Sequence, residues 1–472
     1  MADGKQMNEE LKQRIEQKRL RKRKRLDHVL STQTIMILYV VILLIALFLL
    51  VVPRSKVSKI EKRDLTKLPK ISGKSIISGE FARGLQSYYD DTVPFRDSFK
   101  NLNNSMKNKF GIRSKETVEI VGNVNKEEPA AKTETKKDYK QAEAEGTFNN
   151  GFLIVQMDGH WRGLPLYSGN NFDKYTSFMS DLQKAVGKKV HLYSMPIPLA
   201  SAYYLPSNFS EYSSDQREAI EKVLSKLPKK ITGINLIDVL GDHADEDIYL
   251  RTDHHWSQIG AFYAGKALAK AADVPYAKKS SYAKIKREGY VGSLYGYTQS
   301  ANIKEDPETF TILIPSAKYS NTYHDSGFNY INDKDLFLST DLDNSYLTFI
   351  GGDVTPVHVR TEQDNDRKLL IIKDSYGNPL PSLFVSSFEE IYSIDHRYCE
   401  FNLPKFIKDQ GITDVVTAFS IYTVSNPPES LNNMLTQYTD KNIPNDEPEP
   451  KQPSVSPHYD SAKKGEDDLL VN

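Results

Sequence analysis

Short apolar runs alternate with amphipathic helical patterns through the middle of the chain, and this alternation limits the fold more than any other feature. Apolar residues recur at helical spacing over 175–182 and over 220–227, and each pattern leads into a strand-like run. Five runs are predicted as strands: Val190–Met195, Gly233–Leu240, Lys368–Ser375, Glu390–Asp395 and Ile412–Phe419. Strands separated by helices favour an α/β fold with a mostly parallel five-stranded sheet covered on both faces. In such sheets ligands bind outside the carboxyl ends of the strands.

Composition excludes several classes of protein. The chain has 472 residues, of which 39% are hydrophobic and 26% charged, enough to bury the core of one large or two smaller domains. The formal net charge is zero, so no overall basic field favours nucleic acid. Cys399 is the only cysteine, which rules out an internal disulfide framework and a cysteine-based structural zinc site.

The apolar run from Ile35 to Val52 predicts a single transmembrane helix. It is longer than the core of a usual signal peptide, and no small-residue cleavage site follows it, so we expect an uncleaved anchor. The dense basic run from Lys18 to Arg25 predicts a cytoplasmic N-terminus, with the remainder of the chain outside the cell. Basic residues also follow the apolar run, which weakens the charge asymmetry on which this orientation depends.

Changes in composition and periodicity predict the domain organisation. Apolar residues at helical spacing between Phe81 and Tyr88 and between Phe99 and Phe110 predict two helices of a stalk. Two other segments are poor in apolar residues and rich in charge or proline, a composition typical of disorder. The predicted parts are a cytoplasmic basic tail (1–30), a transmembrane anchor (31–53), a helical stalk (54–122), a disordered insertion (123–149), a catalytic α/β domain (150–430) and a disordered tail (431–472).

Two polar clusters fall at the expected carboxyl edge of the sheet. One is RTDHHW, residues 251–256, ahead of a helix predicted from about Gln258 to Lys270, and the other is KDSYGN, residues 373–378. Ser375 stands at a strand-to-helix turn, where hydrolase-like enzymes present a nucleophile near backbone N–H groups that stabilise an oxyanion. A serine nucleophile needs a base oriented by an acid, and His255 with Asp253 supplies both, because residues i and i+2 of an extended segment project to the same side.

Other interpretations of these residues remain. A serine at the end of a strand is more often a turn or cap residue than a nucleophile. Adjacent histidines are also typical of zinc sites, but His254 is expected to point away from His255, and no HExxH spacing is present. We therefore expect no metal. Trp256 and Cys399 are interpreted as core residues.

The block TDHHW, residues 252–256, followed by GAFYAG, residues 260–265, resembles the signature of the DHHW family, a group of bacterial membrane-anchored proteins. That family is similar in turn to the alginate O-acetyltransferases of SGNH-hydrolase-like fold. The blocks FARGLQSYYDDTVPFRDSF, IIKDSYGN and IDHRY extend the resemblance over most of the chain. The resemblance implies a three-layer α/β/α domain and gives Asp253, His255 and Ser375 the roles of a catalytic triad.

One block departs from the family pattern. The usual segment reads Asp-Pro-Arg-Tyr, where this chain has Asp395, His396, Arg397 and Tyr398. Arg397 and Tyr398 are candidates for oxyanion or substrate contacts, with ordinary ion pairing and packing as the alternative. Two residues after the serine complete the set of oxyanion or substrate candidates, Tyr376 and Asn378.

A serine nucleophile with these partners forms an acyl-enzyme, which is either hydrolysed or passed to a bound hydroxyl. The resemblance implies transfer: an extracytoplasmic O-acetyltransferase without cofactor, supplied by a membrane-bound O-acyltransferase, with a cell-surface polysaccharide as acceptor. Its place is then the cell membrane, with the catalytic domain outside. The alternatives are an O-acetyl esterase that uses the same residues and a non-catalytic surface protein that binds or assembles polysaccharide.

Overall fold

The computed structural model describes residues 141–436 and 451–465 continuously. Before residue 141 it describes only separate positions and short stretches, of which 36–44 and 80–95 are the longest. The chain divides into two units, Met1–Ile112 and Arg113–Asn472, and each is considered by itself. Other predicted segments lie wholly or mostly outside the described residues: the basic tail 1–30, the second stalk helix at 99–110 and most of the insertion 123–149.

The first unit corrects the prediction of a transmembrane helix. Residues 36–44, within the predicted span, are helical with exposed apolar side chains. Among the residues that the structure describes, no helix is both long enough and apolar enough to cross a membrane.

The other described elements of the first unit are small. β1 (Val57–Ser58) pairs with β2 (Arg63–Asp64) in an antiparallel arrangement. α3 (Glu80–Thr92) includes the helical pattern expected from Phe81 to Tyr88. The Arg54 guanidinium donates a hydrogen bond to the Thr92 hydroxyl, with Nη1 and Oγ1 3.0 Å apart.

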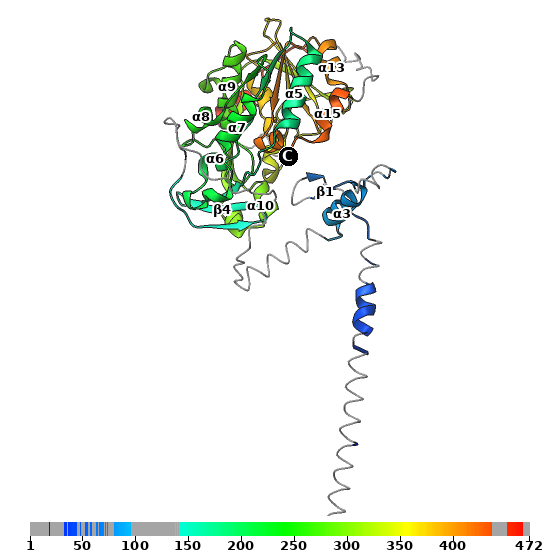
Figure 1. The fold of residues 1–472 in the computed structure, drawn as a ribbon. Coiled ribbons are helices and arrows are strands. Elements are labelled where there is room, and N and C mark those ends of the chain that lie inside the picture. The colour runs from blue at the N-terminus through cyan, green and yellow to red at the C-terminus, as the bar shows by residue number, and fades with distance from the viewer. Residues whose placement is uncertain are drawn as a thin grey trace, which may run out of the picture. The chain divides into compact units, whose positions relative to one another are not determined.

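The second unit is built on an eight-stranded mixed sheet (Figure 1). Its strand order is β11-β10-β12-β14-β13-β15-β6-β7. The strands are β6 (His191–Ser194), β7 (Ile231–Gly233), β10 (Tyr319–His324), β11 (Tyr330–Asp333), β12 (Val357–Thr361), β13 (Lys368–Lys373), β14 (Glu390–Asp395) and β15 (Asp414–Ala418). The pairs from β14 through β13, β15 and β6 to β7 are parallel, whereas β12, β10 and β11 add to β14 as antiparallel strands.

The predicted five-stranded, mostly parallel sheet is therefore wrong. β10 reads YSNTYH and β11 reads YIND, so neither carries the continuous apolar run on which the strand prediction depended. The predicted strand Gly233–Leu240 is also wrong, because β7 ends at Gly233 and α8 (Ile237–Gly241) follows. A short apolar run does not distinguish a buried strand from a buried helix by periodicity.

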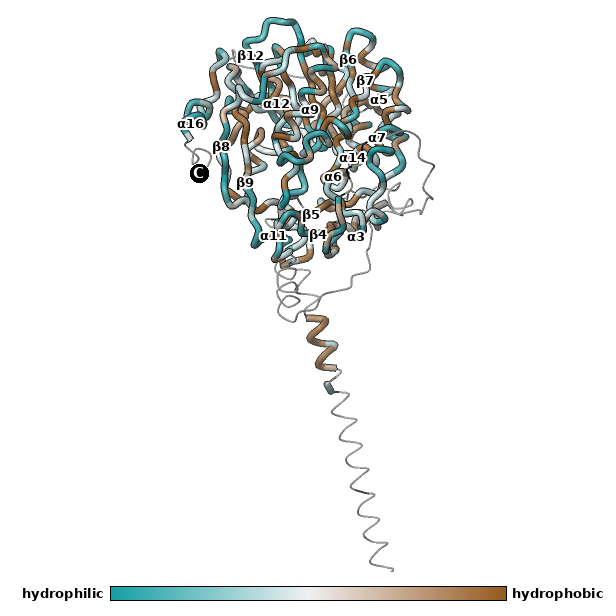
Figure 2. Tube along the Cα trace, turned by 90° about the vertical axis from the view of Figure 1, so that its left-hand side faces the viewer, coloured by the Kyte–Doolittle hydropathy of each residue, from teal (hydrophilic) through white to brown (hydrophobic). Residues whose placement is uncertain are grey.

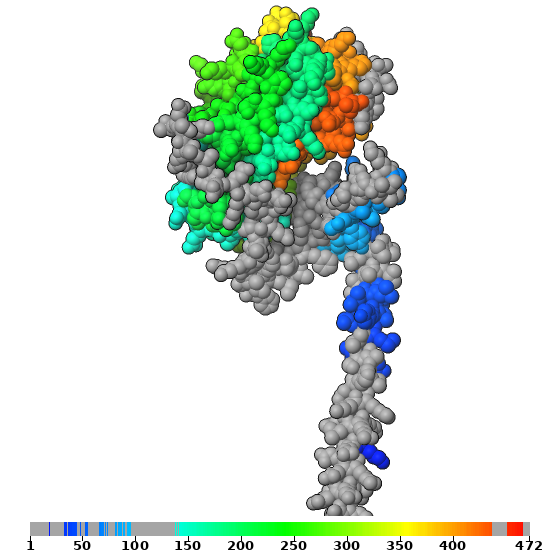
Figure 3. All heavy atoms as spheres, viewed as in Figure 1, coloured from blue at the N-terminus to red at the C-terminus, as the bar shows by residue number. Residues whose placement is uncertain are grey.

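Helices cover both faces of the sheet. α12 (Leu380–Leu383) leads from β13 to β14, and α13 (Leu403–Asp409) leads from β14 back past β13 to β15. Right-handed crossovers that run in opposite directions lie on opposite faces. Two helix groups follow from the contacts: α13 with α5 (Asp173–Val186) and α15 (Glu429–Thr436), which adjoin in Figure 3, and α12 with α9 (Gln258–Ala272) and α8.

The central strands are buried on both faces because these helices cover them. Residues Leu369 to Ile372 of β13 are fully buried, and β15 is buried along its whole length. Figure 2 shows hydrophobic segments gathered in the interior of the unit and hydrophilic loops around it. This burial fixes the position of the carboxyl end of β13, where Ser375 is partly exposed between buried neighbours.

Smaller elements surround the sheet. One antiparallel sheet contains β3 (Gly146–Asn149), β4 (Phe152–Met157) and β5 (His160–Pro165), and another contains β8 (Ala283–Tyr290) and β9 (Glu308–Ile314). The remaining helices are α6 (Ser201–Tyr204), α7 (Gln216–Ser225), α10 (Ser293–Thr298), α11 (Ala301–Glu305), α14 (Ile421–Ser425), α16 (Tyr459–Lys464) and the 3₁₀ helices η1 (Ser207–Tyr212), η2 (Lys279–Ser281), η3 (Leu342–Thr348) and η4 (Ser375–Gly377).

Parts of the two segments with disorder-like composition have regular structure. Residues 141–149 of the insertion are described, and they end in β3, which pairs with β4. In the tail, Ser454 and Tyr319 exchange two backbone hydrogen bonds, of 2.9 and 3.1 Å. α16 then packs against β8 and buries Ala462. Residues 437–450 and 466–472 of the tail lie outside the described residues.

Candidate active site

The structure brings the two polar clusters together at the carboxyl end of β13. The strand ends at Lys373, and Ser375 opens η4. His255 Nε2 lies 2.7 Å from Ser375 Oγ, and His255 Nδ1 lies 2.7 Å from Asp253 Oδ1. We call these three residues the Asp-His-Ser chain. Asp253 and His255 are buried and Ser375 is partly exposed, so the hydrogen-bonded chain leads from the interior to the surface.

The Asp-x-His spacing works through a turn and not through an extended segment as expected. Residues 251–255 form a bend, and the backbone N–H of His255 donates to Asp253 Oδ1 at 3.1 Å. A carboxylate that binds the N–H two residues later is a common local turn. Because the same oxygen meets His255 Nδ1, the turn holds acid and base in contact, with the ring proton on Nδ1 and Nε2 free to accept from the serine.

Donors surround the Asp253 carboxylate. His255 binds Oδ1 of this carboxylate. The other oxygen, Oδ2, accepts hydrogen bonds from the Tyr290 hydroxyl at 2.8 Å and from the Ser293 backbone N–H at 2.9 Å. Burial alone raises the pKa of Asp253, but the facing His255 and the donors hold that pKa well below its usual value. The carboxylate therefore stays charged and fixes the tautomer of His255.

A glycine makes this close packing possible. A Cβ atom at Gly292 would lie 2.5 Å from Asp253 Cβ and 2.6 Å from Oδ2. Only glycine therefore allows the first turn of α10 to bring the Ser293 N–H against the carboxylate. The Thr252 hydroxyl accepts a hydrogen bond from the Gly292 N–H at 3.0 Å. This second bond also holds the start of α10 against residues 252–253.

His254 does not point away from His255 as predicted. The two rings lie 3.8 Å apart with planes inclined at 38°, and His254 Nδ1 lies 2.6 Å from the Ser293 hydroxyl. The ring is therefore beside the Asp-His-Ser chain but bound to Ser293 and not to Ser375. Burial, together with the neighbouring His255, lowers the pKa of His254 to about 3, so this ring is neutral at physiological pH.

The same residues offer ligand atoms for a metal ion. One ligand atom each from Asp253, His254 and His255 lie within 4.8 Å of one another. Both nitrogens of His255 and both oxygens of Asp253 already have hydrogen-bond partners within the site. An ion would have to displace the bond to Asp253 or to Ser375, so the arrangement suits proton transfer better than metal binding.

Trp256 joins the two sequence blocks. Its indole N–H donates to the Tyr376 carbonyl at 2.6 Å, and the Tyr376 hydroxyl donates to the His254 carbonyl at 2.5 Å. Trp256 is fully buried and Tyr376 is nearly so. Tyr376 was predicted as an oxyanion or substrate contact, and the structure engages its hydroxyl with the backbone beside the base.

Asn378 and Arg397 meet at Asp353, a residue without a sequence signal. The Asn378 amide donates to Asp353 Oδ1 at 2.9 Å, and Arg397 Nη2 donates to Asp353 Oδ2 at 2.9 Å. Arg397 also donates to both oxygens of Asp395, with Nε to Oδ1 at 2.8 Å and Nη2 to Oδ2 at 2.6 Å. Its guanidinium lies 5.4 Å from the ring centre of Tyr398 and is partly exposed. Ion pairing thus orients Arg397 and leaves part of it accessible.

His396 replaces the proline of the family pattern and is almost fully buried. Its Nδ1 lies 2.9 Å from the Ser430 hydroxyl. Burial lowers the pKa of His396 to about 4. Below the pKa of about 6.5 that histidine has in an unfolded chain, the unfolded state therefore binds a proton that the folded state refuses.

We expect this histidine to weaken the fold in mild acid. Between pH 6.5 and pH 4, protonation of His396 in the unfolded state lowers the free energy of unfolding by roughly 1 to 3 kcal/mol. The variant His396→Gln removes this contribution, so its unfolding free energy falls less over the same range. Urea unfolding at a series of pH values measures both slopes. Equal slopes in the two proteins would contradict the assignment.

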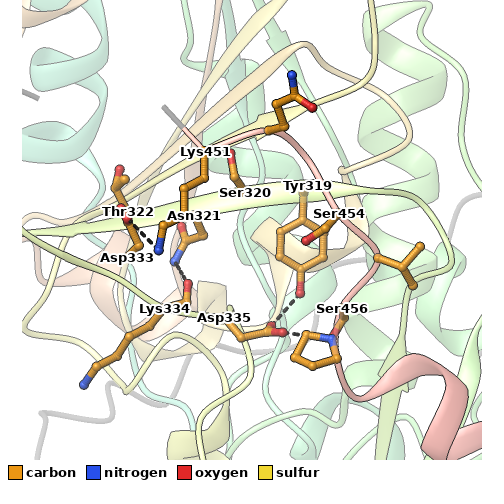
Figure 4. Close-up of a pocket in the computed structure, with 13 residues that line it drawn as sticks. Tyr319, Ser320, Asn321, Thr322, Asp333, Lys334, Asp335, Lys451, Ser454 and Ser456 are labelled. Atoms are coloured by element: carbon orange, nitrogen blue, oxygen red, sulfur yellow. Dashed lines mark hydrogen bonds and ion pairs between the residues drawn. The ribbon is translucent and has the colours of Figure 1, made fainter. Parts of the chain in front are cut away.

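A polar pocket of about 240 Å³ lies elsewhere, between β10, β11 and residues 451–457 (Figure 4). Asp335 accepts hydrogen bonds there from the hydroxyls of Tyr319 at 2.6 Å and Ser456 at 2.9 Å. Tyr319 pairs with Thr361, at the end of β12 that is remote from Ser375. The pocket is therefore separate from the Asp-His-Ser chain.

Four residues that contact the Asp-His-Ser chain or the side chains beside it carry no signal in the sequence analysis: Tyr290, Ser293, Tyr346 and Asp353. They come from β8, α10, η3 and the loop before β12. No local spacing connects them to the motif, because tertiary packing brings them to the site. The turn after β8, where a glycine precedes a serine, is the single local feature that marks one of them.

Comparisons with known proteins agree with this architecture. The model of the family described as DHHW protein matches residues 61–144 and 124–394. A DHHW family protein from Eubacterium siraeum is 38% identical, with a TM-score of 0.61 over 62% of this chain and 99% of that one. No curated protein matches the chain.

Two other solved structures are more distant. Bacillus cereus PatB1 with a sulfonyl adduct is 19% identical, with a TM-score of 0.50 over 60% of this chain and 98% of that one. The O-acetyltransferase domain of Pseudomonas putida AlgJ is 14% identical, with a TM-score of 0.33 over 60% of this chain and 98% of that one. The likeness to PatB1 concerns the fold alone. The family model covers more than half of the residues, and the resemblance seen in the sequence is confirmed: the chain belongs to the DHHW family.

Proposed function

We propose that the chain is a serine-dependent O-acetyltransferase that moves an acetyl group through Ser375 onto a hydroxyl of a cell-surface polysaccharide. The Asp-His-Ser chain, with two successive contacts of 2.7 Å ending at a partly exposed serine, is the observation that carries the proposal. Its place at the carboxyl end of a central strand is where α/β sheets bind ligands. Membership of the DHHW family supports it further.

In the first half-reaction, Ser375 Oγ attacks the acetyl carbonyl and its proton passes to His255 Nε2. The charged Asp253 stabilises the imidazolium that forms. The leaving group then takes the proton from His255, which leaves an acetyl ester on Ser375. Asp253 does not itself take up the proton, because its pKa is held low.

The developing oxyanion needs hydrogen-bond donors. We propose that the backbone N–H of Ser375, the second amide N–H of Asn378 and the open part of Arg397 supply them. Asp353 binds Asn378 and Arg397 and so sets the direction of both side chains. Tyr398 is proposed to contact the acceptor beside Arg397.

In the second half-reaction, His255 takes a proton from an acceptor hydroxyl, which attacks the acetyl-serine. Because water competes with the acceptor, the same residues support an O-acetyl esterase. We propose that transfer takes place outside the cytoplasm and that a membrane-bound O-acyltransferase supplies the acetyl group. If so, loss of that acyltransferase from the host should remove the polysaccharide acetyl groups as fully as Ser375→Ala does. Continued acetylation in its absence would contradict the partnership.

The test is to incubate the full-length chain with 4-nitrophenyl acetate and a mixture of cello- and chito-oligosaccharides. Mass spectrometry of the saccharides and assay of free acetate follow the two fates of the acetyl group. Acetylated saccharide that requires Ser375 supports the transferase, whereas acetate alone favours the esterase. If neither product exceeds the level made by Ser375→Ala, the chain is a non-catalytic surface protein.

A further inference from the structure

Tyr346 contacts both the base and the nucleophile of the Asp-His-Ser chain. Its ring stacks on the imidazole of His255, with ring centres 3.9 Å apart and planes inclined by only 5°. Its hydroxyl donates to the backbone carbonyl of Ser375 at 3.0 Å. The side chain is 5% exposed, so water does not compete for either contact. A single side chain thus connects the two groups between which a proton must move.

The imidazole is enclosed on its other sides as well. The neutral ring of His254 lies 3.8 Å from it, and the ring of Tyr376 meets it at 5.2 Å with planes inclined at 62°. With the ring centres of Tyr346 and His254 only 3.9 and 3.8 Å from that of His255, rotation of the imidazole would bring it into a steric clash. A base held in this way keeps Nε2 directed at the serine.

A strained turn follows η3, the 3₁₀ helix that contains Tyr346, and leads to a second contact with the site. Ile350, Gly351 and Gly352 have φ angles of 51°, 72° and 96°. A β-branched residue in the left-handed region is an outlier, and such outliers cluster at functional sites. The turn delivers Asp353, whose carboxylate binds Asn378 and Arg397. Residues 346–353 therefore reach the site at both of their ends.

We propose that Tyr346 is a positioning residue, which holds the His255 ring in line between Asp253 and Ser375 while its hydroxyl fixes the turn that carries the serine. The proposal rests on the serine-dependent function given above. Asp253 binds His255 directly, and the Asp353 carboxylate is close enough to interact with the imidazole electrostatically. When His255 is protonated during the reaction, it stacks on the π system of Tyr346. The neighbouring His254 is neutral and therefore does not repel it.

Two substitutions separate the two contacts of Tyr346. Tyr346→Phe keeps the stack and loses the bond to the Ser375 carbonyl, so kcat for 4-nitrophenyl acetate should fall by about 2- to 10-fold. Tyr346→Leu loses both, so kcat should fall by about 100-fold. KM should stay near the wild-type value in both variants, since Tyr346 is buried against the base and is expected to act through His255 and not through the substrate.

Phenylmethanesulfonyl fluoride provides a second readout that does not depend on the natural substrate. Ser375 Oγ forms a bond to sulfur, the S–F bond breaks, and fluoride leaves while the serine proton passes to His255. The rate of inactivation should follow the same order: wild type, then Tyr346→Phe, then Tyr346→Leu. Peptide mapping confirms Ser375 as the labelled residue.

Tyr282→Leu is the matched control. Tyr282 is also 5% exposed, and its hydroxyl likewise donates to a backbone carbonyl, that of Leu383 at 3.3 Å. A merely structural role for Tyr346 predicts that both leucine variants lower Tm and leave kcat unchanged in the folded fraction. That result would overturn the proposal. Two other results would do the same: a kcat of Tyr346→Phe as low as that of Tyr346→Leu, and a failure of the sulfonyl fluoride to label the wild-type protein. A different outcome separates the two proposals. If the rate of labelling depends on Tyr346 but the protein transfers no acetyl group, the positioning role is supported and the proposed function is refuted.

Discussion

Replacing Ser375 with alanine is expected to lower acetyl-ester turnover by roughly 10⁴- to 10⁶-fold and to leave the fold intact. The hydroxyl supplies the nucleophile, and its Oγ lies 2.7 Å from the base, His255 Nε2. Ser375 is partly exposed, so its removal leaves no large cavity in the core. Steady-state kinetics of the purified chain measure the loss, and thermal unfolding measures the fold.

Ser281→Ala serves as the control for this substitution. Ser281 also lies in a 3₁₀ helix and is partly exposed, and its hydroxyl donates to the Lys278 carbonyl at 2.7 Å. Its turnover should equal that of the wild type. Turnover of Ser375→Ala near the wild-type rate would remove the assignment of the nucleophile.

The second large effect distinguishes the adjacent histidines. His255→Ala is expected to lose as much activity as Ser375→Ala, because members of a catalytic triad act as a unit. His254→Ala is expected to lower Tm and to reduce kcat by about 10-fold or less, since its ring is bound to Ser293 and only packs on His255. Kinetics and thermal unfolding of both variants test the difference. Equal catalytic losses, or a greater loss at His254, would mean that the base is misassigned.

The sequence predicted the part of the fold whose signal is local. Leu369 to Ile372 form a continuous apolar run because the strand is buried on both faces, and a serine shortly after such a run is recognisable in the sequence. Asp253 and His255 meet through a turn that spans two residues, so their spacing alone indicated the pair. The reason given from the sequence was an extended segment, and the structure replaces it with the turn.

What the sequence did not predict depends on long-range packing. β10 and β11 carry tyrosine and asparagine where the parallel strands carry aliphatic residues. β11 is an edge strand and is partly exposed, whereas β10 is almost wholly buried and its polar side chains find partners, as when the Asn321 amide donates to the Lys334 carbonyl. Tyr346 and Asp353 are separated from Ser375 by β12 and β13, and their contacts exist only once those strands are paired. Such residues leave no periodicity or spacing in the chain.

Peptide mapping of an acid-quenched reaction tests the central claim most directly. The full-length chain is mixed with 4-nitrophenyl acetate, quenched in acid so that an ester survives, digested and examined by mass spectrometry. We expect a single acetyl group on the peptide that contains Ser375, absent from Ser375→Ala and strongly reduced in His255→Ala. Continued turnover with the acetyl group on another residue, or with no acetyl-enzyme in either protein, would contradict it.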